Sequence, residues 1–263
     1  MKKVLVIGVN SYIGKKFSQH VAIDLKESIS VNLISGSNGE WKNAKFENFD
    51  IILHLSAIVH QKEDSKLKDI YDKINHLMAV DIARKAKKSG IKQFIFMSTA
   101  AVFGSHVTCI TQDTVPNPTT YYGKSKLAAE EDIIKLQSDD FKVVIVRPPM
   151  VYGEGCKGNY AKLVKLARYT PIFPRVHNKR SMINIVNLNK YIIELIKDES
   201  SGYYHPQDKK YMETSEMIVE IRKEEGKKTY LIGGYDLVIL FFAKYVSSIN
   251  KMFSDFYYDT HLE

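Results

Sequence analysis

Cysteine is scarce in this chain, and long apolar runs are missing. Cys109 and Cys156 have no paired spacing, so we expect neither a disulfide nor a cysteine-based metal site, and we predict no bound metal. The most apolar stretch, 237–243, is too short to cross a bilayer and is expected to pack within the protein. The N-terminus has no apolar core of signal-peptide length, which favours a cytoplasmic protein without a transmembrane segment.

The charge balance points to an anionic partner without naming it. The chain has 263 residues, of which 44% are hydrophobic, and a formal net charge of +8. Such an excess suits nucleic acid, a membrane surface or a phosphorylated small molecule. Lysines such as Lys85, Lys87 and Lys88 are interpreted as a solvated helix face, and no basic-aromatic motif occurs. Nucleic acid is therefore not expected as a partner.

A glycine turn follows the first apolar run. Residues 4–7 predict a strand buried on both faces, and a helix is expected over 15–26. Between them, Gly8 and Gly14 allow a tight turn and a close helix-to-strand contact, and the helix N-terminus offers unpaired N–H groups to a pyrophosphate. The turn fits a dinucleotide, although ordinary turns also contain glycine.

A carboxylate is missing where an NAD site usually has one. The second predicted strand, 30–35, ends at Ser35 and is followed by Gly36, Ser37 and Asn38 instead of Asp or Glu. Nothing there repels the extra phosphate of NADP, yet no Arg is present to bind it. The choice between NAD and NADP stays open.

Strand and helix patterns alternate through residues 1–148. Three further buried strands and one helix are expected, the strands at 50–56, 93–97 and 141–146 and the helix at 67–89. This alternation predicts an α/β fold with a Rossmann-like, doubly wound parallel sheet. Residues 149–263 are expected to form a smaller substrate-binding domain, with the helix near 187–198 returning to the first domain. His54 is interpreted as a core or loop histidine rather than a ligand.

One pair of side chains organises the expected site. Tyr122 and Lys126 stand four residues apart at the start of the helical segment 124–137, so they share a helix face. A phenol with a pKa near 10 is a poor base at neutral pH. A cation close by is expected to lower that pKa, so we expect Lys126 to tune Tyr122.

The Tyr-x-x-x-Lys spacing also arises by chance, as Tyr12 and Lys16 show. Its weight comes from its neighbours. The strand at 93–97 delivers Ser98 and Thr99 to the carboxyl edge of the sheet, where open α/β sheets bind ligands.

Together these motifs resemble those of the extended short-chain dehydrogenase/reductases, in the NAD-dependent epimerase/dehydratase family that acts on nucleotide sugars. The resemblance covers nearly the whole chain. It rests on ordered segments: 8–14, 54–57, Asn75, 98–104, Tyr122 with Lys126, 147–155 and 180–188.

The resemblance implies roles for individual side chains. Tyr122 would be the catalytic base, Lys126 its pKa-lowering partner and a ribose ligand, and Thr99 the hydroxyl that hydrogen-bonds the reacting sugar oxygen. Arg180 and Asn159 would bind the diphosphate of a nucleotide-sugar substrate. The residues expected to bind NAD or NADP are Gly8, Asn10, Ser11, Tyr12, Ile13, Gly14, Ser35, Leu55, Ser56, Ala57, Asn75, Tyr122 and Lys126.

Three positions depart from the family pattern. Ser11 replaces the middle glycine of the turn, where its Cβ would crowd a pyrophosphate or its hydroxyl would donate to it. Asn187 replaces a common Asp, and Phe103 a common Tyr. The chain is also short for a 4-epimerase, which leaves the identity of the sugar open.

The resemblance implies hydride transfer at a sugar hydroxyl or ketone carbon. A UDP-sugar 4-epimerase is favoured because residues 100–102, Ala-Ala-Val, resemble that group. An NADPH-dependent 4-keto-6-deoxy nucleotide-sugar reductase is the alternative, given the missing acid after Ile34 and the short substrate domain. A dehydratase is disfavoured because Asp-Glu does not follow Thr99.

A non-catalytic dinucleotide sensor is the alternative of another class. Sensors of this fold typically lack the Tyr or the Lys, whereas Tyr122 and Lys126 are both present. By analogy with the family, a homodimer is expected to form through 67–89 and 124–137.

Overall fold

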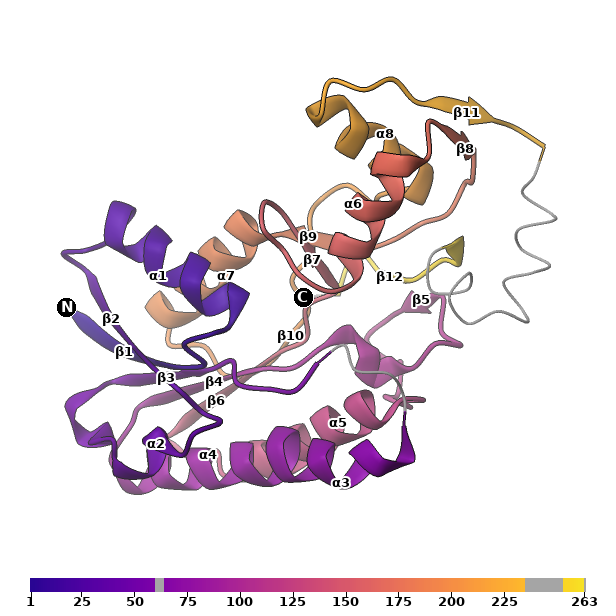
Figure 1. Cartoon of the computed structure of the whole chain (residues 1–263). Coiled ribbons are helices and arrows are strands. Elements are labelled where there is room, and N and C mark those ends of the chain that lie inside the picture. Colours follow the sequence, from indigo (N-terminus) through magenta and orange to yellow (C-terminus); the bar gives the residue numbers. More distant parts are fainter. Residues whose placement is uncertain (60–63, 235–252, 263) are drawn as a thin grey trace.

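The molecule is built on a parallel sheet. The computed structural model describes residues 1–59, 64–234 and 253–262, so the apolar stretch 237–243 lies outside the described residues. Six strands pair in the order β10-β6-β4-β3-β1-β2 (Figure 1). They are β1 (Lys2–Ile7), β2 (Ile29–Ile34), β3 (Ile51–His54), β4 (Gln93–Met97), β6 (Lys142–Val146) and β10 (Gly202–Tyr204). The predicted α/β parallel sheet is confirmed.

Alternate residues along the strands pack into two separate hydrophobic cores, one on each face of the sheet. Val4 and Val6 of β1 pack with Phe17 on one face, beneath α1 (Tyr12–Asp24) and α7 (Ile185–Lys197). Leu5 and Ile7 point to the other face, which is covered by α4 (Met78–Lys88) and α5 (Tyr121–Ile134). Because both faces are buried, the strand reads as a continuous apolar run.

The sheet takes one strand from the second half of the chain. β10 pairs with β6 in parallel, with Tyr203 opposite Ile145, and α7 packs against α1. The sequence pattern placed a helix near 187–198 beside this sheet but missed the strand, because a three-residue, partly exposed segment is too short to show periodicity.

A second group of elements lies apart from the sheet (Figure 1). Helices α6 (Asn159–Tyr169) and α8 (Thr214–Glu224) pack together over a core that includes Leu163 and Ile218. Three two-stranded pairs accompany them: β7 (Met150–Tyr152) with β9 (Met182–Asn184), β8 (Ile172–Pro174) with β11 (Tyr230–Ile232), and β5 (Cys109–Ile110) with β12 (Tyr257–Tyr258). The domain boundary at residue 149 stays a prediction.

The helix predicted over 67–89 is a composite. A 3-10 turn (Ser65–Leu67) and α3 (Lys68–Tyr71) lead into a π-helical turn (Asp72–Leu77) and then α4, which is followed by Gly90 at φ 78. Short π-helical insertions are frequent at functional sites. Here the turn contains Asn75, which is fully buried.

The connection from β2 to β3 contains a short helix instead of a strand. Between Ile34 and Ile51 the chain forms α2 (Glu40–Asn43) and a 3-10 turn (Phe46–Asn48). Lys85, expected on a solvated face, instead donates from Nζ to three carbonyls, those of Trp41, Lys42 and Ala44, at 3.0, 2.7 and 2.8 Å. A cation suits the carbonyl end of a helix, so Lys85 holds α2 in place.

Candidate active site

The glycine turn lies where β1 and β3 end side by side. Gly8 has φ 137, and a Cβ there would lie 3.1 Å from the nitrogen of Ser56 and 3.2 Å from the carbonyl carbon of Leu55. A Cβ on Gly14 would lie 3.2 Å from the carbonyl oxygen of Gly8. A side chain at either position would push against the neighbouring backbone, and the φ of Gly8 is one that other residues rarely adopt; both glycines thus bring the start of α1 close to the strand ends. This backbone cradle fits a pyrophosphate.

Ser11 is compatible with the cradle because it caps the helix. Its Oγ accepts a hydrogen bond from the nitrogen of Gly14 at 3.4 Å, and its backbone is extended, as at other N-caps. The hydroxyl proton is not used by this bond. Of the other turn residues, Asn10 is exposed, Ile13 packs on the core, and the Tyr12 hydroxyl donates to the Glu154 carbonyl at 3.0 Å.

Asn75 holds the loop after β3. Its Oδ1 accepts from the nitrogen of Ile58 at 2.8 Å, and its Nδ2 donates to the Ile58 carbonyl at 3.0 Å and to Oγ of Ser125 at 3.2 Å. The loop containing Leu55, Ser56 and Ala57 is thereby tied to α5. Any contribution of Asn75 to cofactor binding therefore acts through this loop.

Thr99 and Tyr122 are brought together at the end of β4. Thr120 caps α5 by accepting from the nitrogen of Gly123 at 3.0 Å, which places Tyr122 in the first turn. The Thr99 side chain lies near enough to the Tyr122 phenol to influence its pKa. Burial raises the pKa of Tyr122 to about 12; the Thr99 side chain opposes the shift, and nearby Tyr71 adds to it.

Lys126 is buried beneath Tyr122 on the same helix. Its side chain is 1% exposed, and its Nζ lies 3.8 Å from the ring centroid of Phe96. Burial lowers the pKa of Lys126 to about 7, against the influence of Glu130. Lys126 was expected to lower the Tyr122 pKa; instead burial raises that pKa, and Lys126 is not among the groups that shift it.

A buried ion pair supports this corner of the site. Glu130 accepts from Arg147 Nε at 3.2 and 3.1 Å and from Arg147 Nη2 at 2.6 Å, and the Ser98 hydroxyl donates to the same carboxylate. Ser98 precedes Thr99, so the pair braces the backbone that presents the Thr99 hydroxyl. Sequence reasoning missed Glu130, although its position four residues after Lys126 marks the same helix face.

The two residues expected to bind substrate lie in the second group of elements. Asn159 is exposed at the first position of α6. Arg180 donates from Nη1 to the Ser254 carbonyl at 2.7 Å, and burial lowers its pKa to about 10 while Asp255 opposes the shift. One nitrogen of the Arg180 guanidinium is therefore used to hold the C-terminal segment.

Both remaining departures from the family pattern have structural partners. Asn187 donates to Asp208 Oδ1 at 2.7 Å, and the same carboxylate accepts from the Tyr152 hydroxyl at 2.8 Å. Asp208 thus brings a carboxylate to the place where Asn187 replaces an Asp, which no local pattern could show. Phe103 is buried, with the Arg147 guanidinium carbon 5.1 Å from its ring centroid.

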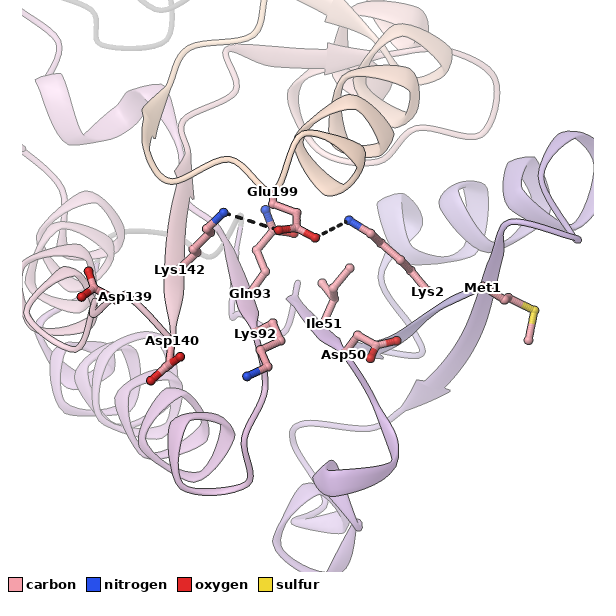
Figure 2. A pocket seen from close by; sticks show the side chains of 10 residues that line it. All are labelled: Met1, Lys2, Asp50, Ile51, Lys92, Gln93, Asp139, Asp140, Lys142 and Glu199. Atoms are coloured by element: carbon pink, nitrogen blue, oxygen red, sulfur yellow. Dashed lines mark hydrogen bonds and ion pairs between the residues drawn. The ribbon is translucent and has the colours of Figure 1, made fainter.

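A charged hollow of about 470 Å³ lies at the opposite edge of the sheet. Figure 2 shows Lys2 and Lys142 pointing to Glu199, with N–O distances of 3.2 and 3.5 Å. The lining includes Asp50 and Gln93, at the amino ends of the strands. Because it lies at the amino ends of the strands, far from the glycine turn, this hollow is not the candidate site.

His54 is a core histidine, as its position in an apolar strand predicted. It is fully buried, and its ring stacks on Phe94 and Phe96 at centroid distances of 6.1 and 5.8 Å. Burial, followed by the charge of Lys126, lowers its pKa to about 3 from the ordinary 6.5. The ring therefore stays neutral in the folded protein at physiological pH.

We expect this histidine to weaken the fold in acid. The unfolded chain takes up a proton at His54 as the pH falls below about 6.5 and the folded chain does not, so stability falls between pH 6.5 and 3. The difference in free energy of unfolding between His54→Phe and the parent should shift by roughly 2 kcal/mol in favour of the variant when the pH falls from 7.5 to 4.5. Urea denaturation at both pH values measures this. Exposed His106→Phe is the control, and an equal pH effect in both variants would contradict the assignment.

The comparisons with known proteins agree with this geometry. The profile of the NAD dependent epimerase/dehydratase family matches residues 4–185, which include the glycine turn, Thr99, Tyr122 and Lys126. The chain belongs to this family. The match extends through β9, so it covers β2, β3, β4, β6 and most of β1, and it ends before β10.

Two curated proteins are similar to this chain over about seven tenths of its length. A UDP-glucose 4-epimerase from Vibrio cholerae is 32% identical over 196 residues, which are 70% of this chain and 60% of that protein. An N-acetyl-alpha-D-glucosaminyl-diphospho-ditrans,octacis-undecaprenol 4-epimerase from Escherichia coli O157:H7 is 25% identical over 73% of this chain and 62% of its own length. The chain thus spans about three fifths of these curated relatives.

Solved structures show the same fold at lower identity. A dTDP-4-dehydrorhamnose reductase from Clostridium acetobutylicum has a TM-score of 0.72 and 21% identity, over 88% of this chain and 83% of that one. MoeE5 in complex with UDP-glucose and NAD has a TM-score of 0.73 and 16% identity, over 99% and 90%. Among the described residues, no helix has both the length and the apolar content of a membrane span.

Proposed function

We propose that the chain is a nucleotide-sugar oxidoreductase of the UDP-sugar 4-epimerase type that works by hydride transfer at a sugar carbon. One observation carries the proposal: at the carboxyl edge of a parallel sheet the Thr99 side chain, after β4, lies beside the Tyr122 phenol of α5, the helix that also presents Lys126. Ligands bind at this edge in open α/β sheets. Similarity to the Vibrio cholerae epimerase supports the choice of reaction.

The glycine turn, Ser35 and the loop of Leu55, Ser56 and Ala57 would hold an NAD-type dinucleotide. Two features support the binding of a dinucleotide here. Gly8 packs closely on the backbone of Leu55 and Ser56, and the N–H groups at the N-terminus of α1 suit a pyrophosphate. When bound, such a cofactor supplies a hydride acceptor and donor. Ser11 keeps a hydroxyl proton available to a phosphate oxygen, and Asn75 keeps the 55–58 loop in place.

Side chains of the protein would transfer the proton. Tyr122 Oη removes the proton from a sugar hydroxyl and returns it when the ketone is reduced, and Thr99 fixes the phenol and the reacting oxygen by hydrogen bonds. A phenol that is neutral in this structure, with a pKa near 12, is ready to donate. To accept, it needs a positive charge nearby, which Lys126 on the same helix face would supply when it is protonated.

The residues after Thr99 favour this reaction over dehydration. Eliminating water from the sugar needs an additional acid and base beside the Thr. Ala100 and Ala101 occupy those positions in a 3-10 turn (Ala100–Phe103), and neither side chain can exchange a proton.

The reaction is tested with purified protein and nucleotide sugars. Interconversion of UDP-glucose and UDP-galactose, or of their N-acetylated forms, without added reductant is the expected result. Consumption of NADPH on a 4-keto-6-deoxy nucleotide sugar, with no epimerisation, would replace it by the reductase alternative. Dinucleotide binding without turnover of any of these sugars would indicate a sensor instead.

Arg180 gives a second test of the substrate class. Arg180→Ala should raise KM for the UDP-sugar about tenfold or more with a smaller change in kcat, because a partly buried guanidinium makes charge-assisted contacts with a diphosphate. Arg168→Ala, which removes an exposed arginine paired with Glu225, is the control. An unchanged KM with a lowered melting temperature would assign Arg180 to holding Ser254 alone.

We also propose a homodimer through residues 67–89, which include α3, the π-helical turn and α4, and through residues 124–137 of and after α5. Ile70 and Leu77, seven residues apart on the neighbouring α3 and π-helical turn, are 43% and 50% exposed. Two large apolar side chains on one outer helical surface support pairing with a second copy.

A further inference from the structure

The end of β2 receives a carboxylate from outside the strand. Ser35 follows β2, where an NAD site usually has its acid, and its backbone nitrogen donates to Oε2 of Glu40 at 2.9 Å. Glu40 is the first residue of α2 and stands five positions later in the sequence. The carboxylate missing from the sequence pattern is therefore present in space.

This carboxylate lies beside the glycine turn. The carbonyl of Ile34 accepts hydrogen bonds from the nitrogens of Gly8 and Val9 at 2.8 and 3.0 Å. Ser35, the next residue, is thus one peptide from the backbone that forms the cradle. The following Gly36 packs so closely on the loop after β3 that a Cβ would lie 2.4 Å from Oγ of Ser56. Glu40 therefore borders the space between the ends of β1 and β2.

The short helix that presents Glu40 is fixed from two sides. Trp41 is 9% exposed and packs in the core beneath α4, and Lys85 binds the carbonyls of Trp41, Lys42 and Ala44. Asn38 adds a hydrogen bond, since its Oδ1 accepts from the Glu40 nitrogen at 3.0 Å. Such anchoring leaves Glu40 pre-positioned at Ser35 and its second oxygen, Oε1, directed to no hydrogen bond within the described residues.

We propose that Glu40 selects the cofactor: its carboxylate accepts hydrogen bonds from the adenosine ribose hydroxyls of NAD and repels the 2′-phosphate of NADP. This inference rests on the proposed function, because it assumes that a dinucleotide binds at the glycine turn. A carboxylate in this place serves as an acceptor for ribose and as a like charge against phosphate. The nearest competing cation on α2, Lys42, is exposed, and its Nζ lies 5.9 Å from the Trp41 ring centroid.

Calorimetric titration with NAD and with NADP tests the inference by the ratio of the two Kd values. The parent protein should bind NAD at least about tenfold more tightly than NADP. Glu40→Gln keeps the shape and removes the charge; it should weaken NAD binding and reduce the ratio about tenfold. Glu47→Gln, an exposed change on the same connection, is the matched control and should leave the ratio unchanged. Lys85→Met, which releases the carbonyl end of α2, should also reduce the ratio.

The possible results distinguish the role of Glu40 from the proposed function on which it rests. Equal binding of NAD and NADP by the parent, a preference for NADP, or equal weakening of both by Glu40→Gln would overturn the role of Glu40 while leaving a dinucleotide enzyme. Binding of neither dinucleotide would overturn both proposals.

Discussion

Replacing Tyr122 with Phe should lower kcat for nucleotide-sugar turnover by about a thousandfold or more, while the Kd for NAD changes by less than about threefold. The hydroxyl is the only titratable group of that side chain, and its neighbours Thr99 and Ala101 cannot replace it as an acid or base. The ring itself remains, so packing against Tyr71, at a centroid distance of 6.3 Å, is retained. Single-turnover assays and calorimetric titration measure the two quantities.

Tyr169→Phe is the matched control for Tyr122→Phe, because it removes the same hydroxyl from a tyrosine that is 77% exposed on α6. Its kcat should equal that of the parent. Full activity of Tyr122→Phe would remove the proposed mechanism. A parallel loss of NAD binding would instead show that the change disturbs the cradle and not the proton transfer.

The parts of the site that could be predicted are those determined by neighbours in the sequence. Gly8 is recognisable because a strand, a sharp turn and a helix follow one another within a few residues, and Gly14 because it begins the helix. Thr99 is placed by the end of an apolar strand, and Tyr122 and Lys126 by helical spacing. In each case a local rule gives a position in the fold, and strand order then brings the carboxyl ends together.

The parts that could not be predicted depend on contacts between distant residues. Glu40 reaches Ser35 from α2, which is held in part by Lys85, more than forty positions later. Asp208 serves Asn187 from a loop beyond β10. The Tyr122 pKa was expected to fall, since a cation on the same face suggested it, whereas burial raises it. Burial is set by the whole fold, and sequence spacing does not report it.

Burial disfavours the charged forms of the side chains that form the candidate catalytic site. Lys126 is buried with a pKa near 7, and burial raises the pKa of Tyr122, so both groups resist the ionised forms that proton transfer uses. Sites that favour function over stability need support from their surroundings. The buried pair of Glu130 and Arg147 provides that support, because Glu130 follows Lys126 by one helical turn and binds Ser98 beside Thr99.

Replacing Glu130 with Ala should therefore destabilise the protein by about 3–5 kcal/mol, since it leaves the Arg147 guanidinium buried without a counter-charge. Arg147 cannot turn easily to solvent, because Tyr203 and Phe103 lie over it at 4.5 and 5.1 Å from their ring centroids. Urea denaturation measures the loss, with exposed Glu131→Ala on the next position of α5 as the control. Adding Arg147→Met to Glu130→Leu should recover much of the loss, because two apolar side chains need no pairing. A cost below about 1 kcal/mol for Glu130→Ala would mean that the pair is not what braces Thr99.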